Sequence, residues 1–400
     1  MIPVSPISEL VASLGVLILA GIFISSYSFR FRMPDVLLLI LIGMFFGGVK
    51  YNGNPLLSFP LFFLAFISIF SLCILFFDTS SVFRWRTFHT FSLRSFFLVF
   101  SFTVLLLFFY SFFVRWVLDV SLVSAILFSL MLAGTAPEFL LQMFGDAKSR
   151  IIQVLHFESL FGSFVVLIPV ILLFFYDSSV IDVSVFTLNV VSRVVLSSGV
   201  GVLIAILLWK IFHVFSASRY SAPALLCSSI LSYILAELVG GVGIIGVIAF
   251  GIFFGNVYFK DDFSLLGFPS VFGKFLYIVL FGLMGIIIPV SFTLEFVGLS
   301  FLLFFVHILS RLVAVLMVRR SFHFSLWEVF FVACTAPKGG AFASVIFALA
   351  IFSKSGVATI PGLDVLLPFA VALFAYSLIF SMITVFFSKK LFGVDVQEKE

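Results

Sequence analysis

The chain has 400 residues, of which 63% are hydrophobic and 10% are charged, and its formal net charge is +4. Globular proteins have roughly a quarter of their residues charged, so an ordinary water-soluble domain is excluded. Disorder is excluded as well, because it needs low hydrophobicity and high charge. The basic residues fall mostly in loops, so no nucleic-acid partner is expected. The composition predicts an all-α protein whose solvent is the lipid bilayer.

About 13 segments have the character of a membrane helix, which needs roughly 20 mostly apolar residues. In chain order they cover 8–29, 34–50, 57–77, 95–117, 120–145, 151–176, 185–212, 222–239, 241–257, 270–290, 296–318, 325–350 and 364–388. The boundary between the eighth and ninth segments is the weakest, because it rests only on Gly240 and Gly241. We expect a single transmembrane domain over residues 1–400, with a short cytoplasmic tail at 391–400.

Lys and Arg are distributed unequally between the two ends of these segments. The loops after odd-numbered segments, taken with the C-terminus, hold 16 of the 22 basic residues, and the opposite loops hold 4. Basic residues concentrate on the cytoplasmic side of membrane proteins. We therefore expect a multi-pass protein of the plasma membrane, with its N-terminus outside and its C-terminus in the cytoplasm.

Two short motifs recur at the same interval. Thr-Ala-Pro at 135–137 reappears at 335–337, and the Gly-x-Phe-Phe-Gly of 43–47 reappears at 251–255. Both intervals equal seven segments, so the matching helices run in opposite directions through the membrane. This predicts the inverted-topology repeat of secondary transporters, and the paired glycines predict close helix packing. The halves are segments 1–6 (residues 1–176) and 8–13 (residues 222–390), joined by a connecting helix at 185–216.

The Thr-Ala-Pro motifs interrupt the fifth and twelfth segments near their middles. Pro137 and Pro337 each remove a backbone hydrogen bond. Gly134 precedes the first motif, and Gly339 and Gly340 follow the second. Freed backbone groups at membrane depth persist only inside protein or beside a water-filled cavity. Either the two helices are merely kinked, or they are discontinuous helices that cross near the midplane and build a transport site, and their corresponding positions favour the second interpretation.

Charged side chains inside the segments mark the candidate site, because each costs roughly 3 kcal/mol at the centre of a membrane helix. Glu138 follows the first motif, Lys338 follows the second, and Glu158 lies in the sixth segment. The most economical arrangement pairs Lys338 with Glu158 or Glu138. That pair is either a fixed structural ion pair or a titrating part of the transport site. Arg311 and His307, four residues apart in the eleventh segment, are candidates for a local polar face.

Ser159 and Ser163 share a face of the sixth segment. Their hydroxyls either coordinate a small cation or bond to their own helix backbone, as serines in membrane helices more often do. The sequence has no metal-protease motif and no Gly-rich phosphate loop, so a membrane enzyme is not expected. We expect no cofactor, and no metal beyond a transported cation.

Several stretches resemble the sodium(cation)/proton antiporter family, of the thirteen-span NhaP and sodium–proton exchanger type. The resemblance covers nearly the whole chain and implies the antiporter fold, cation/proton exchange and a homodimer. The stretches similar to the helices of the family are MPDVLLLILIGMFFGG (33–48), AELVGGVGIIGVIAFGIFFGN (236–256) and FLYIVLFGLMGIII (275–288). Those similar to its site motifs are TAPE (135–138), FESLFGS (157–163) and APKGGAFASVIFALA (336–350).

The resemblance carries over unevenly to single residues. Thr135, Glu158 and Ser159 match the family motifs. Lys338 stands for the family arginine, which implies its pairing with Glu158. Asp78, at the end of the third segment, stands for an acidic residue near the cation site of the family.

The central carboxylates of the family are replaced. Ala136 stands where the family has the aspartate of Thr-Asp-Pro, and Gly162-Ser163 stand where it has Asn-Asp. Antiport by competition needs a group that binds either a proton or a metal ion, and neither Ala nor Ser titrates. Either Glu138 supplies a replacement carboxylate, or Glu158 leaves its ion pair and takes over, or ordinary antiport is lost.

The leading hypothesis is a secondary transporter that exchanges Na⁺ or K⁺ for protons by alternating access. Thr135, Glu138, Glu158, Ser159 and Ser163 would line its site. One alternative is a non-transporting homologue that acts as a membrane scaffold or regulatory subunit, and another is a transporter of a different solute on the same fold. The expected partners are the bilayer, a monovalent cation, the proton and a second copy of the chain.

Overall fold

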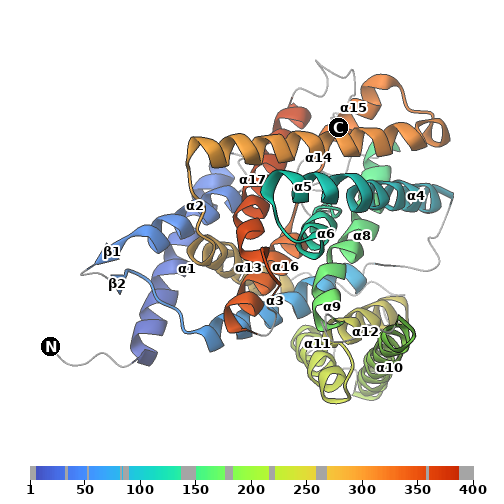
Figure 1. The fold of residues 1–400 in the computed structure, drawn as a ribbon. Helices are drawn as coiled ribbons and strands as arrows, with labels where there is room; N and C mark the ends of the chain where they lie inside the picture. The colour runs from blue at the N-terminus through green and yellow to red at the C-terminus, as the bar shows by residue number, and fades with distance from the viewer. Residues whose placement is uncertain are drawn as a thin grey trace. The chain divides into compact units, whose positions relative to one another are not determined.

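The structure is a computed structural model that describes residues 6–31, 35–51, 54–81, 83, 90–136, 150–175, 183–215, 221–257, 268–356 and 360–386. Over these residues it consists of helices and one small hairpin, β1 (Lys50–Tyr51) and β2 (Asn54–Pro55). The helices of the first half are α1 (Pro6–Phe31), α2 (Asp35–Gly48), α3 (Leu61–Ser81), α4 (Thr90–Leu105), the π-helix η2 (Leu106–Tyr110), α5 (Ser111–Leu118), α6 (Leu122–Met131), α8 (Arg150–Val166) and α9 (Ile168–Phe175) (Figure 1).

The remaining helices begin with α10, the connecting helix expected at 185–216. They are α10 (Val183–Phe215), α11 (Ser221–Leu238), α12 (Gly243–Val257), α13 (Phe268–Ile287), α14 (Leu294–Phe322), α15 (Leu326–Cys334), α16 (Gly340–Ser355) and α17 (Leu363–Phe386). Each apolar segment of the sequence contains at least one of these helices. The boundary expected near Gly240 is confirmed, because α11 ends at Leu238 and Gly240 turns the chain with a φ of +84°.

Within the described parts of the chain, seven helical stretches are long and apolar enough to cross a membrane: 7–28, 61–81, 93–118, 151–172, 188–213, 294–322 and 363–386. Six shorter apolar helices accompany them. Large apolar side chains face outward, as with Phe23 (75% exposed) and Trp116 (82% exposed). Such surfaces are unfavourable in water and match acyl chains. The prediction of an all-α, multi-pass membrane protein is therefore confirmed.

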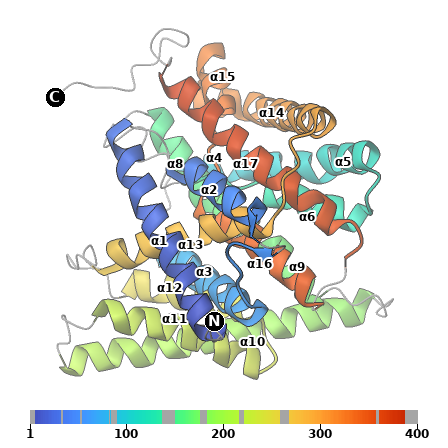
Figure 2. The ribbon, with the colours of Figure 1, turned by 90° about the vertical axis from the view of Figure 1, so that its left-hand side faces the viewer.

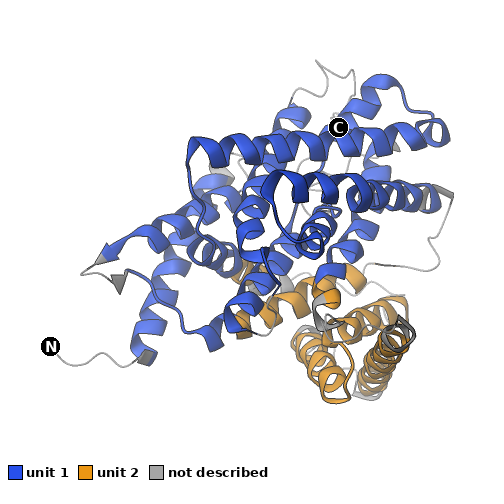
Figure 3. Ribbon diagram, in the orientation of Figure 1, with its two compact units in different colours: residues 1–64, 89–169, 278–400 blue, residues 65–88, 170–277 orange. Residues whose placement is uncertain are grey.

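The chain divides into two compact units (Figure 3). Unit 1 comprises Met1–Leu64, His89–Pro169 and Ile278–Glu400, and unit 2 comprises Ala65–Phe88 and Val170–Tyr277. Within unit 1, α4 packs against both α8 and α14, and α17 packs against α6, α14, α15 and α16. Within unit 2, α10, α11 and α12 pack against one another, as Figure 2 shows.

The recurring glycines pack helices closely in both units. A Cβ atom on Gly43 would lie 2.2 Å from the carbonyl oxygen of Gly282, so α2 and α13 touch through their backbones. A Cβ atom on Gly255 would lie 2.1 Å from the carbonyl oxygen of Ser81, so α12 approaches the end of α3 in the same way. The second segment thus meets the tenth, and the ninth meets the third. This reciprocity is what a repeat with a seven-segment offset requires.

The N-terminus of helix α15 is capped by side chains. The Ser325 hydroxyl accepts the N–H of Glu328 at 3.2 Å, and the Glu328 carboxylate accepts the N–H of Ser325 at 2.6 Å. This capping box satisfies two backbone donors at the helix N-terminus. It places the start of a nine-residue helix, and therefore the position at which that helix ends beside the second Thr-Ala-Pro motif.

Candidate functional site

Two interrupted helices meet inside unit 1. Helix α6 ends at Met131 and residues 132–136 continue without helical structure, while residues 335–339 separate α15 from α16. The N–H of Ala136 donates to the carbonyl of Pro337 at 2.8 Å, so the two Thr-Ala-Pro motifs touch directly. The expected meeting of the two motifs is therefore confirmed over the residues that the structure describes. Pro337 lies in its break as expected, and Pro137 lies outside the described residues.

The break between α15 and α16 has its backbone donors satisfied by α17. The N–H of Ala336 donates to the Ser381 hydroxyl at 3.1 Å, and the N–H of Lys338 donates to the Ser377 hydroxyl at 3.2 Å. Both serines are buried. Because a lost backbone hydrogen bond at membrane depth costs several kcal/mol, these side chains allow the chain to leave the helix.

The other interrupted segment packs tightly on α8. A Cβ atom on Gly134 would lie 2.0 Å from Val166 Cγ2, and one on Gly162 would lie 3.2 Å from Gly134 Cα and 3.3 Å from the Thr135 nitrogen. Gly162 is one of the two positions at which the antiporter resemblance expects Asn-Asp. The segment at 133–135 lies directly against α8, so a larger side chain at Gly162 would have to displace it.

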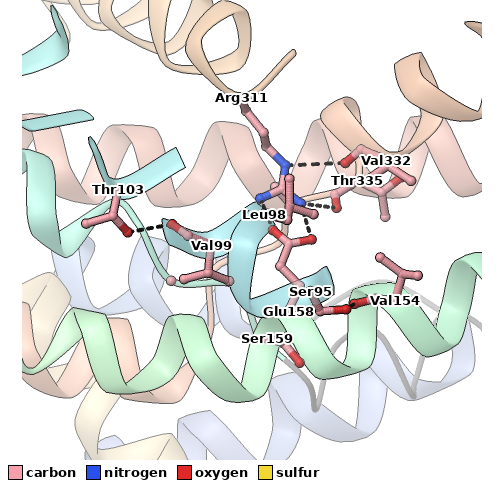
Figure 4. Close-up of polar contacts among 12 residues, drawn as sticks. Ser95, Leu98, Val99, Thr103, Val154, Glu158, Ser159, Arg311, Val332 and Thr335 are labelled. Carbon is pink, nitrogen blue, oxygen red and sulfur yellow. Dashed lines mark hydrogen bonds and ion pairs between the residues drawn. The ribbon is translucent and has the colours of Figure 1, made fainter. Parts of the chain in front are cut away.

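Glu158 forms a buried ion pair with Arg311. The Arg311 Nη1 atom lies 2.6 Å from Glu158 Oε1, and Nη2 donates to Oε2 at 3.1 Å, while the two side chains are only 1% and 2% exposed. The guanidinium also donates to the carbonyls of Val332 at 3.3 Å and Thr335 at 3.4 Å, and Figure 4 shows it between α8 and the end of α15. This forked geometry joins α14, α8 and the second break.

The expected pairing of Lys338 with Glu158 is corrected by this geometry. The Lys338 ammonium is 1% exposed and donates to the carbonyl oxygens of Leu132 and Gly134, the latter at 2.7 Å. Its interaction with the Glu158 carboxylate is a Coulombic attraction over a distance, without a direct contact. The planar guanidinium of Arg311 contacts both oxygens of the Glu158 carboxylate, one by a hydrogen bond and one as an ion pair, whereas a lysine ammonium is a point charge. Lys338, which precedes α16, is therefore hydrogen-bonded to the residues that follow α6.

The hydroxyl groups of the site fall into two classes. Ser159 donates to the His156 carbonyl at 2.7 Å and Ser163 donates to the Ser159 carbonyl at 2.8 Å, which is the backbone-bonding alternative. Each oxygen retains lone pairs that can accept a hydrogen bond or coordinate a cation. Thr135 and Thr335 are buried, and their Oγ1 atoms have no hydrogen-bond partner within the part of the chain that the structure describes.

The remaining predicted residues are not placed at the crossing. Glu138 lies outside the described residues. Asp78 lies in α3 and belongs to unit 2, whereas the crossing belongs to unit 1, so its membership of the site stays a prediction. His307 lies buried between the ring edges of Phe102 and Tyr110, with centroid distances of 5.4 Å and 5.7 Å. It thus packs as a core side chain on the face of α14 that carries Arg311.

The structure adds two residues to the site that the sequence analysis does not include, Arg311 and Thr335. Arg311 carried a signal, because a charge in the middle of a long apolar helix needs a buried acidic partner. Thr335 carried one too, because it matches Thr135 in the repeated motif.

The comparisons with known proteins agree with this arrangement. The family model described as "Sodium/hydrogen exchanger, transmembrane" matches residues 14–390. A structure of the sodium proton antiporter MjNhaP1 from Methanocaldococcus jannaschii at pH 8 superimposes with a TM-score of 0.74 at 20% identity, covering 96% of this chain and 100% of that one. An electron-microscopy structure of the same antiporter gives a TM-score of 0.73 at 17% identity and covers 98% of each chain. No curated protein matches the sequence. The chain belongs to the sodium/hydrogen exchanger family, whose members are secondary transporters and not enzymes.

Proposed function

We propose that this protein exchanges a monovalent cation, Na⁺ or K⁺, for protons by alternating access at the crossing of the two Thr-Ala-Pro motifs. The observation that carries the proposal is the direct contact between Ala136 and Pro337, beside the buried charges of Glu158, Arg311 and Lys338. Family membership supports exchange over a scaffold role or the transport of another solute. Broken helices that meet at one place provide backbone groups for an ion and a hinge for the change of access.

The charge of the crossing indicates which carboxylate is needed. Among the described side chains there, Glu158 is the acid, and Arg311 and Lys338 are the bases. A cation entering this surplus of positive charge needs a second carboxylate. We assign that role to Glu138, which follows two residues after Ala136, the position at which the family has an aspartate. Glu158 holds Arg311 in place and is the first acidic group of the site, while Lys338 balances charge.

Oxygen atoms that complete the site come from hydroxyl groups. Thr135 has an uncommitted buried hydroxyl, and Ser159 and Ser163 present oxygen lone pairs from the neighbouring helix. Hydroxyl and carbonyl oxygens suit Na⁺ and K⁺, which are hard cations. Asp78 stays a predicted member of the cation site, on the family resemblance alone.

The test is a flux measurement on purified protein in proteoliposomes. A pH gradient is set up, Na⁺, K⁺ or Li⁺ is added, and its dissipation is followed between pH 6 and pH 9. We expect at least one cation to dissipate the gradient, and Glu138→Gln to abolish the response. Glu295→Gln is the matched control, because Glu295 is an exposed residue of the first turn of α14. No response in inserted wild-type protein would contradict exchange, and an active Glu138→Gln variant would contradict the assigned carboxylate.

We also propose a homodimer in the plasma membrane, with the N-terminus outside and the C-terminus in the cytoplasm. The orientation is supported by the distribution of Lys and Arg among the loops. The dimer is supported by the family resemblance. Light scattering of the detergent-solubilised protein, corrected for bound detergent, measures the protein mass, and the mass of a single chain would contradict the dimer.

A further inference from the structure

The first broken helix presents a set of oxygen atoms suited to a cation. Leu132 and Gly134 follow the C-terminus of α6, where the last carbonyl groups of a helix lack internal partners and carry partial negative charge. The next residue, Thr135, is only 5% exposed, and its hydroxyl has no hydrogen-bond partner among the described residues. Unwound backbone carbonyls of this kind coordinate monovalent cations in transporters with interrupted helices.

Lys338 already contacts these carbonyls. Its Nζ atom donates to the carbonyl oxygens of Leu132 and Gly134. An ammonium group has the same charge as Na⁺ or K⁺ and binds acceptor oxygens through three donors. The neighbouring acid, Glu158, is held by both terminal nitrogens of Arg311, so the Lys338 ammonium is bound by carbonyl oxygens in place of a carboxylate.

We propose that the carbonyls of Leu132 and Gly134 form a monovalent-cation site that Lys338 fills as a tethered cation. Because the ammonium is attached to the same chain, its local concentration is far above that of a free ion at the same oxygens. A free cation therefore binds these oxygens weakly while Lys338 is in place. The inference deepens the proposed function, since the site lies at the same crossing, yet binding there is measured without transport.

The test compares cation binding to full-length variants in detergent at one fixed pH. Lys338→Gln and Lys338→Met remove the ammonium, and Lys338→Arg keeps a positive charge. Lys354→Gln is the matched control, because the Lys354 ammonium also donates to a backbone carbonyl, that of Ile287 at 3.0 Å, but at an exposed position. The probes are NaCl, KCl and LiCl against choline chloride at equal ionic strength, read out by thermal unfolding and by ²²Na⁺ binding.

We expect both neutral variants to bind at least one of these cations at least about tenfold more tightly than wild type, with a saturable rise in unfolding temperature. Lys338→Arg and Lys354→Gln should behave as wild type. Equal binding by wild type and both neutral variants would overturn the proposal, as would an equal gain in Lys354→Gln. If the neutral variants do not fold in choline chloride, their recovery as a monodisperse species in one of the three salts supports the site, and failure to recover overturns it.

The outcome is independent of exchange activity. A wild-type protein without flux would remove the proposed function, while tighter cation binding by Lys338→Gln would still establish the site. Conversely, active exchange together with unchanged binding in both neutral variants would remove the tethered cation alone.

Discussion

Breaking the Glu158–Arg311 pair should be among the most damaging single changes to stability. In Glu158→Gln, the Arg311 guanidinium stays 1% exposed and loses its counter-ion. Among the described residues it keeps two long carbonyl contacts, at 3.3 Å and 3.4 Å, the face of the Phe102 ring and a neutral amide oxygen in place of the carboxylate. Removing one partner of a buried pair costs about 3–5 kcal/mol, because the other charge remains buried without compensation. We expect the free energy of unfolding to fall by that amount.

The double variant Glu158→Met/Arg311→Met separates charge from packing. Replacing a whole buried pair with apolar side chains of similar volume is often neutral or stabilising. The double variant should therefore be more stable than Glu158→Gln, and a cycle completed with Glu158→Met and Arg311→Met should show a coupling energy of about 2 kcal/mol or more.

The assay is reversible unfolding in mixed micelles, followed by tryptophan fluorescence and helical circular dichroism. Glu295→Gln and Arg320→Met serve as controls at exposed positions of the same helix and should each change stability by less than about 0.5 kcal/mol. If Glu158→Gln costs less than about 1 kcal/mol, or if the changes at the two sites simply add, the buried pair does not support the crossing as argued.

Three further predictions concern packing, capping and orientation. Gly43→Ala should lower the free energy of unfolding by about 1–3 kcal/mol, because the new Cβ atom would meet the backbone of α13. Gly15→Ala is the control and should be neutral or slightly stabilising, because a Cβ atom there would have no atom within 4 Å. Equal effects of the two substitutions would contradict the close approach of the helices. Ser325→Ala should cost about 1 kcal/mol by removing the capping box, and Ser355→Ala much less, which chemical unfolding can compare; no difference between them would show that the cap is not needed. In a cysteine-free background, a membrane-impermeant maleimide should label Ser355→Cys in intact cells and Arg320→Cys only after permeabilisation; the reverse pattern would invert the proposed orientation.

The sequence predicts the helices and the break well because the bilayer imposes simple rules. Its thickness sets the length of each apolar segment, and a proline flanked by glycine inside such a segment leaves few alternatives to an interruption. The repeated Thr-Ala-Pro motif then identifies two interruptions as equivalents. The glycine pairs are found in the same way, since close packing needs small residues at helical spacing.

The partners of the buried charges were harder to predict. Helix α14 is apolar on nearly all sides, so its sequence pattern does not show that Arg311 faces Glu158, which lies 153 residues earlier in the chain. The contacts of Lys338 were invisible for another reason. Backbone carbonyls occur at every residue, and only the three-dimensional course of residues 132–134 shows which of them point at the ammonium.

The most direct measurement of the central claim is a reversible cross-link between the two motifs. Ala136→Cys and Ala336→Cys are combined in a chain from which Cys73, Cys227 and Cys334 have been removed, and the variant is oxidised in proteoliposomes. We expect the cross-link to form, cation-driven proton flux to stop, and a reducing agent to restore the flux. Failure to cross-link, or flux that continues in the cross-linked protein, would show that exchange does not take place where the broken helices meet.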